Sequence, residues 1–211
     1  MTTHRDGREV PSSGTSLIVD RDCSLLGRAP GLPDDVFEHD GLVTKRVIRA
    51  AALAHLRPQP GQWLWDIGVC AGSVAIEWCR GAEGARAIGV ERRSDRASRA
   101  IANAERLAPE GSFDLVVGDA ADVVARLPRP DAVFVGGGGT IAVLETAMEA
   151  LHPGGRIVVH GVTLEAELLA AEAHRRWGGQ LLRMQVETAE PLGRLTGWKP
   201  ARTVIQWHQT V

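Results

Sequence analysis

Short apolar runs alternate along this chain with longer segments of helical periodicity, and this alternation limits it to few folds. The apolar runs predict strands at 63–67, 87–90, 113–117, 132–135 and 156–159. The intervening segments predict helices over 73–79, 94–107, 121–127, 141–151 and 163–177, and an earlier helix that follows a capping Thr44. Such strands, separated by helices, predict a mostly parallel sheet that is covered on both faces.

The last two predicted strands, 181–186 and 203–207, are joined by a polar loop with no room for a crossover helix. They should therefore pair antiparallel at one edge of the sheet. The prediction is an α/β fold: a mostly parallel, Rossmann-like seven-stranded sheet with an antiparallel C-terminal edge hairpin. This is the layout of class I S-adenosylmethionine (SAM)-dependent methyltransferases.

The amino-acid composition indicates how the chain is divided into domains and which classes of partner it excludes. Residues 1–30 are rich in Gly, Pro, Ser, Asp and Arg, so we expect a leader or interdomain linker there and one domain over 31–211. No secretory signal and no apolar run of about 18 residues is present, which predicts no membrane partner. Three cysteines without C-x-x-C spacing predict reduced thiols in the cytoplasm and no metal site. A net charge of -2 argues against nucleic acid as the main partner.

The turn after the first predicted strand carries the strongest ligand signal. The dinucleotide fingerprint G-x-G-x-x-G would need glycines at 68, 70 and 73, and only Gly68 matches. The pattern D-x-G-x-G-x-G, typical of SAM sites, is matched by Asp66, Gly68 and Gly72 but not by Cys70. We therefore predict SAM as cofactor and S-adenosylhomocysteine as product.

Acidic residues follow the next two predicted strands. Glu91 ends the second strand, where a carboxylate can accept both ribose hydroxyls, although it could also be a surface acid. Asp119 follows the third strand, where it could read an adenine edge or cap the next helix.

Four glycines, 136–139, follow the fourth predicted strand. They either let a flat or anionic ligand approach exposed backbone N–H groups or form a flexible turn. The Asn/Asp-Pro-Pro-aromatic tetrad typical of nucleobase N-methyltransferases is missing here, which argues against that activity.

Several segments taken together resemble the decarboxylating, carbon-15-methylating domain of precorrin-6Y methyltransferases of the cobalamin pathway. The resemblance covers residues 31 to about 207 and is carried by segments 31–41, 44–46, 66–68, 76–78, 135–138, 162–165, 191–194 and 196–198. It implies a polycarboxylate tetrapyrrole substrate that is methylated at carbon 15 and loses carbon dioxide from the carbon-12 acetate. It also implies a homotetramer and, in bifunctional relatives, a linked N-terminal domain that methylates carbon 5.

The same resemblance implies roles for individual residues. The SAM contacts would be Thr44, Gly68, Val69, Cys70, Ala71 and Gly72, with Glu91 at the ribose and Asp119 and Ala120 at the adenine. The glycine turn, with Gly136, Gly137 and Gly138, would face the tetrapyrrole. Beyond the resemblance, Lys45, Arg194 and Thr196 are candidate contacts for substrate carboxylates. Thr163 is expected in the same pocket, with Glu165 either beside it or simply a first-turn acid.

Two positions depart from the family pattern. His160 stands where Asn is common, just past the fifth strand, and could be a proton donor, a carboxylate contact or a structural histidine. Cys70 stands where Gly is usual and would crowd the cofactor if its φ is positive. Two other functions stay open on the sequence: an RNA methyltransferase of the same fold, and a non-catalytic SAM-binding module.

Overall fold

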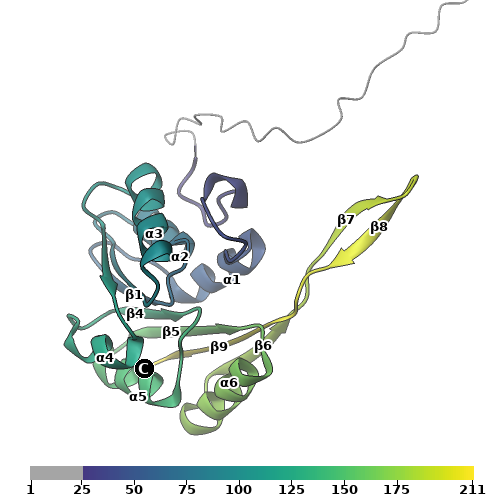
Figure 1. The fold of residues 1–211 in the computed structure, drawn as a ribbon. Helices are drawn as coiled ribbons and strands as arrows, with labels where there is room; N and C mark the ends of the chain where they lie inside the picture. Colours follow the sequence, from purple (N-terminus) through teal and green to yellow (C-terminus); the bar gives the residue numbers. More distant parts are fainter. Residues whose placement is uncertain (1–25) are drawn as a thin grey trace, which may run out of the picture.

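The computed structural model describes residues 26–211 and has three layers, with α1–α3 on one face of a central sheet and α4–α6 on the other (Figure 1). The helices are α1 (Arg46–Leu56), α2 (Ser73–Gly81), α3 (Ser94–Leu107), α4 (Ala120–Val123), α5 (Ile141–Ala150) and α6 (Leu164–Trp177), with short 3-10 helices η2 (Asp34–Val36) and η3 (Val124–Arg126). The strands are β1 (Trp63–Ile67), β2 (Arg86–Glu91), β3 (Phe113–Val117), β4 (Ala132–Val135), β5 (Arg156–Gly161), β6 (Gln180–Met184), β7 (Glu187–Leu192), β8 (Leu195–Pro200) and β9 (Val204–Thr210).

The main sheet has seven strands in the order β3-β2-β1-β4-β5-β9-β6. Strands β1 to β5 pair in parallel, whereas β9 pairs antiparallel with both β5 and β6. The predicted antiparallel pairing of the last two sheet strands is therefore confirmed. Strand β9 lies between β5 and β6 and runs antiparallel to the other six strands of this sheet. Strands β6 and β3 form its two edges.

The chain order reverses direction across the sheet between β1 and β4, which is where open α/β sheets bind ligands. Alternate residues of β1 point to opposite faces, so Leu64 packs with α1 and α2 while Trp65 and Ile67 pack toward α5. Each face of the sheet thus carries a buried cluster of apolar side chains. Together the two clusters hold the carboxyl ends of the central strands in place.

Two expected helices differ in detail. The segment expected to be one helix over 121–127 is a short α4 followed by η3. Helix α1 has Lys45 rather than Thr44 at its N-cap, without a side-chain cap bond. Thr44 instead offers its backbone carbonyl to the guanidinium of Arg49.

The polar loop expected between the last two sheet strands is a separate two-stranded hairpin, β7–β8. It projects from the body of the molecule, and its tip lies far from the central sheet (Figure 1). Leu192, Leu195 and Trp198 on this hairpin are 70%, 76% and 72% exposed.

Residues 31–45, here called the strap, cross from the N-terminal side to α1 and are held by a buried ion pair. Arg49 Nε lies 2.5 Å from Glu77 Oε1, and both side chains are almost fully buried. The Glu77 carboxylate also accepts the backbone N–H groups of Gly31 (2.6 Å) and Leu32 (2.8 Å). The pair therefore joins the strap to both α1 and α2.

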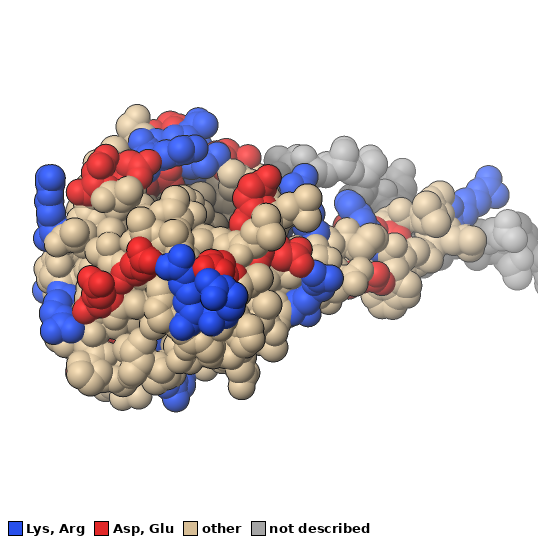
Figure 2. Space-filling view, turned by 90° about the horizontal axis from the view of Figure 1, so that it is seen from below, with Lys and Arg blue, Asp and Glu red and all other residues tan. Residues whose placement is uncertain are grey.

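The predicted leader, residues 1–30, lies mostly outside the described residues. Contacts with the domain reach back to Leu26, which packs against a small apolar cluster around Phe37. No helix in residues 26–211 is long and apolar enough to cross a bilayer. Basic and acidic side chains are interspersed over the face of the body seen from below (Figure 2).

Candidate active site

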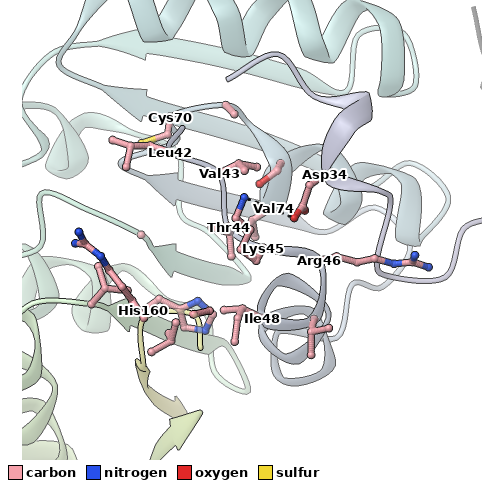
Figure 3. A pocket seen from close by; sticks show the side chains of 18 of the residues that line it. Asp34, Leu42, Val43, Thr44, Lys45, Arg46, Ile48, Cys70, Val74 and His160 are labelled. Carbon is pink, nitrogen blue, oxygen red and sulfur yellow. Dashed lines mark ion pairs between the residues drawn. The ribbon is translucent and has the colours of Figure 1, made fainter. Parts of the chain in front are cut away.

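A cavity of about 740 Å³ opens at the carboxyl ends of β1, β4 and β5. One part, the turn end, is formed by Leu42–Thr44 of the strap and Gly68–Ala71 after β1. The other, the far end, is formed by residues 160–162 at the carboxyl end of β5 and by Val186, Thr188 and 201–204 near the hairpin base. In Figure 3, Cys70 and Leu42 face His160 across the space, with Thr44 between them.

About half of the predicted site residues line this cavity. The lining members are Thr44, Lys45, Gly68, Val69, Cys70, Ala71, Gly136 and His160. The predicted residues outside the lining are Gly72, Glu91, Asp119, Ala120, Gly137, Gly138, Thr163, Arg194 and Thr196.

The turn after β1 packs directly on the turn after β4. Gly68 has φ +74°, and a Cβ there would lie 2.5 Å from the backbone oxygen of Gly137. Gly136 N donates to the carbonyl of Ile67 (2.9 Å), which fixes the approach. Of the glycines after β4, Gly136 therefore walls the cavity, while Gly137 supports the turn from behind.

Cys70 takes the left-handed conformation that the D-x-G-x-G-x-G pattern assigns to glycine. Its φ is +48°, which costs a residue with a Cβ about 1 kcal/mol. Burial, followed by the nearby Glu91 carboxylate, raises the pKa of its thiol to about 11. The side chain is thus an uncharged thiol that occupies part of the turn end.

Glu91 supports the same turn from β2. Its carboxylate accepts the backbone N–H of Cys70 (3.1 Å) and that of Arg93 (3.1 Å), and the residue is buried. The carboxylate thus adjoins the cavity through the Cys70 backbone without lining it.

Asp66 is buried at the end of β1 and lines the turn end of the cavity. Its Oδ2 accepts the N–H of Ala75 (3.0 Å), whereas Oδ1 is buried without a hydrogen-bond partner in the described chain. Burial, with a smaller contribution from Glu91, raises the pKa of this carboxyl to about 7. An unpartnered acceptor at this place suits a cationic ligand group.

Asp119 adopts the capping role that was one of its two expected roles. It is the N-cap of α4, and its side chain accepts the N–H of Ala121 (3.0 Å). Ala120 is buried beside it.

His160 lies at the far end as a neutral imidazole. Burial lowers its pKa to about 4, and Nε2 lies 2.7 Å from Oε1 of the fully buried Gln206. When Gln206 Oε1 accepts this bond, Nε2 carries the hydrogen and Nδ1, which has no partner among the described residues, presents a lone pair. This arrangement disfavours the expected proton donor and carboxylate contact, because both need a free N–H.

The predicted substrate residues at the hairpin and at α6 lie apart from the main cavity. Arg194 and Thr196 lie at the tip of the projecting hairpin. Thr163, the N-cap of α6, lines a smaller cavity of about 390 Å³ that adjoins the far end through Val162 and Arg202. Glu165, in the first turn of α6, lines neither cavity.

Asp34, Val186 and Arg202 are among the residues lining the main cavity that the sequence did not single out. Asp34 approaches Lys45 from the strap, with 3.9 Å between the charged atoms. Val186 and Arg202 belong to segments at the base of the hairpin. The sequence signal that points to Arg202 is a cation immediately before the last predicted strand.

The turn end has the features that a SAM molecule needs. Gly68 leaves a cradle without a Cβ, Asp66 Oδ1 is an acceptor without a partner, and the strap covers the turn from the other side. The volume lies within the range of small-molecule sites and continues beyond the turn to the far end.

Comparison with known proteins agrees with this geometry. Residues 35–211 match a family model described as a precorrin methyltransferase domain. A precorrin-6Y C(5,15)-methyltransferase [decarboxylating] from Sinorhizobium sp is 44% identical over 195 residues, which are 92% of this chain and 47% of that protein. A protein from Pyrobaculum calidifontis, named "Probable cobalt-precorrin-6B C(15)-methyltransferase (decarboxylating)", is 38% identical over 149 residues, 68% of this chain and 76% of that protein.

Among solved structures, the C-terminal domain of precorrin-6Y C5,15-methyltransferase from Rhodobacter capsulatus superposes with a TM-score of 0.82 at 44% identity, over 88% of this chain and all of that one. The chain spans about half the length of the C(5,15) relatives that it matches. The fold is that of class I SAM-dependent methyltransferases, as predicted, and the chain belongs to the precorrin methyltransferase domain family.

Proposed function

We propose that this chain transfers a methyl group from SAM to carbon 15 of a precorrin and removes carbon dioxide from the carbon-12 acetate in cobalamin biosynthesis. One observation carries the proposal: a glycine turn fit for SAM opens into the same cavity as a far end that is large enough for part of a macrocycle. The carbon-15 assignment is supported by coverage, since the chain matches 76% of a protein named for carbon 15 alone but 47% of one named for both carbons.

SAM would be held at the turn end, and when bound it supplies the electrophilic methyl group and leaves as S-adenosylhomocysteine. Gly68–Ala71 would hold the methionine portion, with Asp66 Oδ1 as the acceptor for its ammonium group. Thr44 of the strap would contact the cofactor from the opposite side. Glu91 would accept the ribose hydroxyls, and Asp119 and Ala120 would flank the adenine next to the main cavity.

The precorrin would occupy the far end, where Lys45 and Gly136 border the space between the two ends. Holding an electron-rich carbon in line with the methyl group supplies most of the acceleration in such a transfer. We assign His160 a role as a neutral hydrogen-bond acceptor at this end, in place of proton donation.

The assembly would be a homotetramer built through the β7–β8 hairpin. An isolated two-stranded hairpin is at best marginally stable in water, and this one exposes two leucines and a tryptophan. A partner subunit would cover these side chains and place Arg194 and Thr196 at an interface.

The free thiols of Cys70 and Cys79 support a cytoplasmic enzyme. A linked carbon-5 methyltransferase domain would account for the remaining half of the C(5,15) relatives.

The test is anaerobic turnover of a carbon-5-methylated precorrin with SAM, comparing the wild type with Gly68→Ala. The added Cβ would meet the backbone oxygen of Gly137, so the variant should lose SAM binding and methyl transfer together. We expect the wild type to methylate and decarboxylate the precorrin and the Gly68→Ala variant to leave it unchanged. Methylation of RNA in place of the pigment would support the alternative function; the interspersed charges in Figure 2 do not favour it.

A further inference from the structure

The far end of the cavity continues into a smaller cavity, which we call the side cavity. It has a volume of about 390 Å³, and Val162 and Arg202 line both spaces. Its polar groups are Thr163, Glu167, Arg183, Arg202 and Thr203. It therefore lies at the opposite end of the site from the turn that would hold SAM.

Four cationic side chains border the two cavities; two of them have an acidic partner, and a third points away from the other labelled residues in Figure 3. Lys45 lies 3.9 Å from Asp34, and Arg183 forms an ion pair with Glu167. Arg46 directs its guanidinium away from the other labelled residues (Figure 3). Arg202 has no acidic partner within 4.0 Å among residues 26–211.

The backbone around Arg202 is fixed, although its side chain is exposed. Ala201 N donates to the carbonyl of Val186 (2.9 Å), and the residue after Thr203 enters β9 in register with Met184. The guanidinium is thus attached to a braced segment at the junction of the two cavities.

One free hydroxyl group accompanies this cation. Thr203 lines the same side cavity next to Arg202. The Thr163 hydroxyl is already engaged, because it accepts the N–H of Ala166 (3.2 Å) and hydrogen-bonds to the Glu165 carboxylate. A guanidinium with a neighbouring hydroxyl donor and no carboxylate partner of its own is suited to a ligand carboxylate.

We propose that Arg202, with Thr203, forms a carboxylate-binding subsite in the side cavity that holds one acidic side chain of the macrocycle. This inference rests on the proposed function, because it assigns a position to one carboxylate of the proposed precorrin. It makes Arg202 a specificity-determining residue that orients the ring relative to the methyl group.

The test compares steady-state kinetics of Arg202→Gln and Arg202→Lys with a control, Arg126→Gln, an exposed arginine of η3 that lines neither cavity. With carbon-5-methylated precorrin as substrate, Arg202→Gln should raise the KM for the pigment about tenfold, the effect of losing one charge-assisted contact. Its KM for SAM should stay within twofold, because the turn end is untouched. Arg202→Lys should fall in between, since it keeps the charge but loses the bidentate fork.

A pigment KM within twofold of wild type for Arg202→Gln, with wild type active, would overturn the subsite alone. So would an equal rise in Arg126→Gln, which would indicate a general charge effect. A wild-type protein that binds SAM but leaves the precorrin unchanged would overturn the proposed function and this subsite with it.

Discussion

At the scale of single residues, Cys70 is where this chain departs most clearly from the glycine pattern of its cofactor turn. The structure gives it a left-handed φ of +48° and places its side chain in the cavity wall. The departure thus has two separable consequences, backbone strain and an added thiol in the cavity wall.

Replacing Cys70 with glycine should tighten SAM binding several-fold. Strain relief of about 1 kcal/mol is offset by the greater freedom of glycine in the unfolded chain, so the melting temperature should change little. Calorimetric titration with SAM checks the affinity. Cys70→Ala keeps the Cβ and the strained φ, so a gain in both variants assigns the effect to the thiol. Weaker binding in Cys70→Gly would contradict the interpretation.

Asp66 should make the protein less stable as the pH rises from about 4 to about 7. Its pKa is about 7 in the folded chain and 3.8 ordinarily, so between these values the folded state holds a proton that the unfolded state has lost. The free energy of unfolding therefore falls as pH rises from about 4 to 7, by at most about 1.4 kcal/mol per unit from this group. Asp66→Asn should match wild type near pH 4 and exceed it at pH 8 in urea unfolding. Equal stability at both pH values would refute this assignment.

At the scale of elements, the strap depends on the buried guanidinium of Arg49, which pairs with Glu77 and, at 3.1 Å, with Asp34 of the strap. Removing one partner of such a pair leaves an uncompensated buried charge, so Arg49→Met should lower the free energy of unfolding by about 3–5 kcal/mol. It should also weaken SAM binding, because the strap carries Thr44. Denaturant titration measures the first effect. Arg93→Met, which breaks an exposed pair with Asp95, is the matched control and should change little; similar losses in both would count against the strap.

The sequence predicts some of the strands correctly and misses others. The alternation of apolar runs and helical periodicity predicted β1 to β5 because each of these strands is a short apolar run in the local sequence. The β7–β8 hairpin was missed because Pro191, Gly193 and Pro200 are typical of loops. A free ribbon tolerates proline, since its outer N–H groups need no partner. The placement of β9 inside the sheet is set by tertiary pairing that no local pattern reports.

The residues of the candidate site could also be predicted from the sequence only in part. The turn residues of 68–71 lie at the cavity because a glycine pattern encodes backbone geometry directly. His160 was expected just past the fifth strand and lies within the end of β5, but its charge state depends on burial and on Gln206, which is 46 positions away in sequence. Arg202 was missed for the same reason, since its neighbours come from three separate segments.

At the scale of the whole molecule, the projecting hairpin should govern assembly. Replacing Leu192, Leu195 and Trp198 together with serine removes the exposed apolar surface without touching the sheet core. Light scattering after gel filtration should then show a monomer, with the melting transition of the body retained. A tetramer that survives these substitutions would place the interface elsewhere on the chain.

The central claim is that one cavity carries out both methyl transfer and decarboxylation on a precorrin. The most direct measurement is mass spectrometry of the pigment after anaerobic incubation of the protein with SAM and carbon-5-methylated precorrin. The account predicts a product that has gained one methyl group and lost one carbon dioxide, with one S-adenosylhomocysteine formed per pigment. An unchanged pigment in the presence of bound SAM would contradict it.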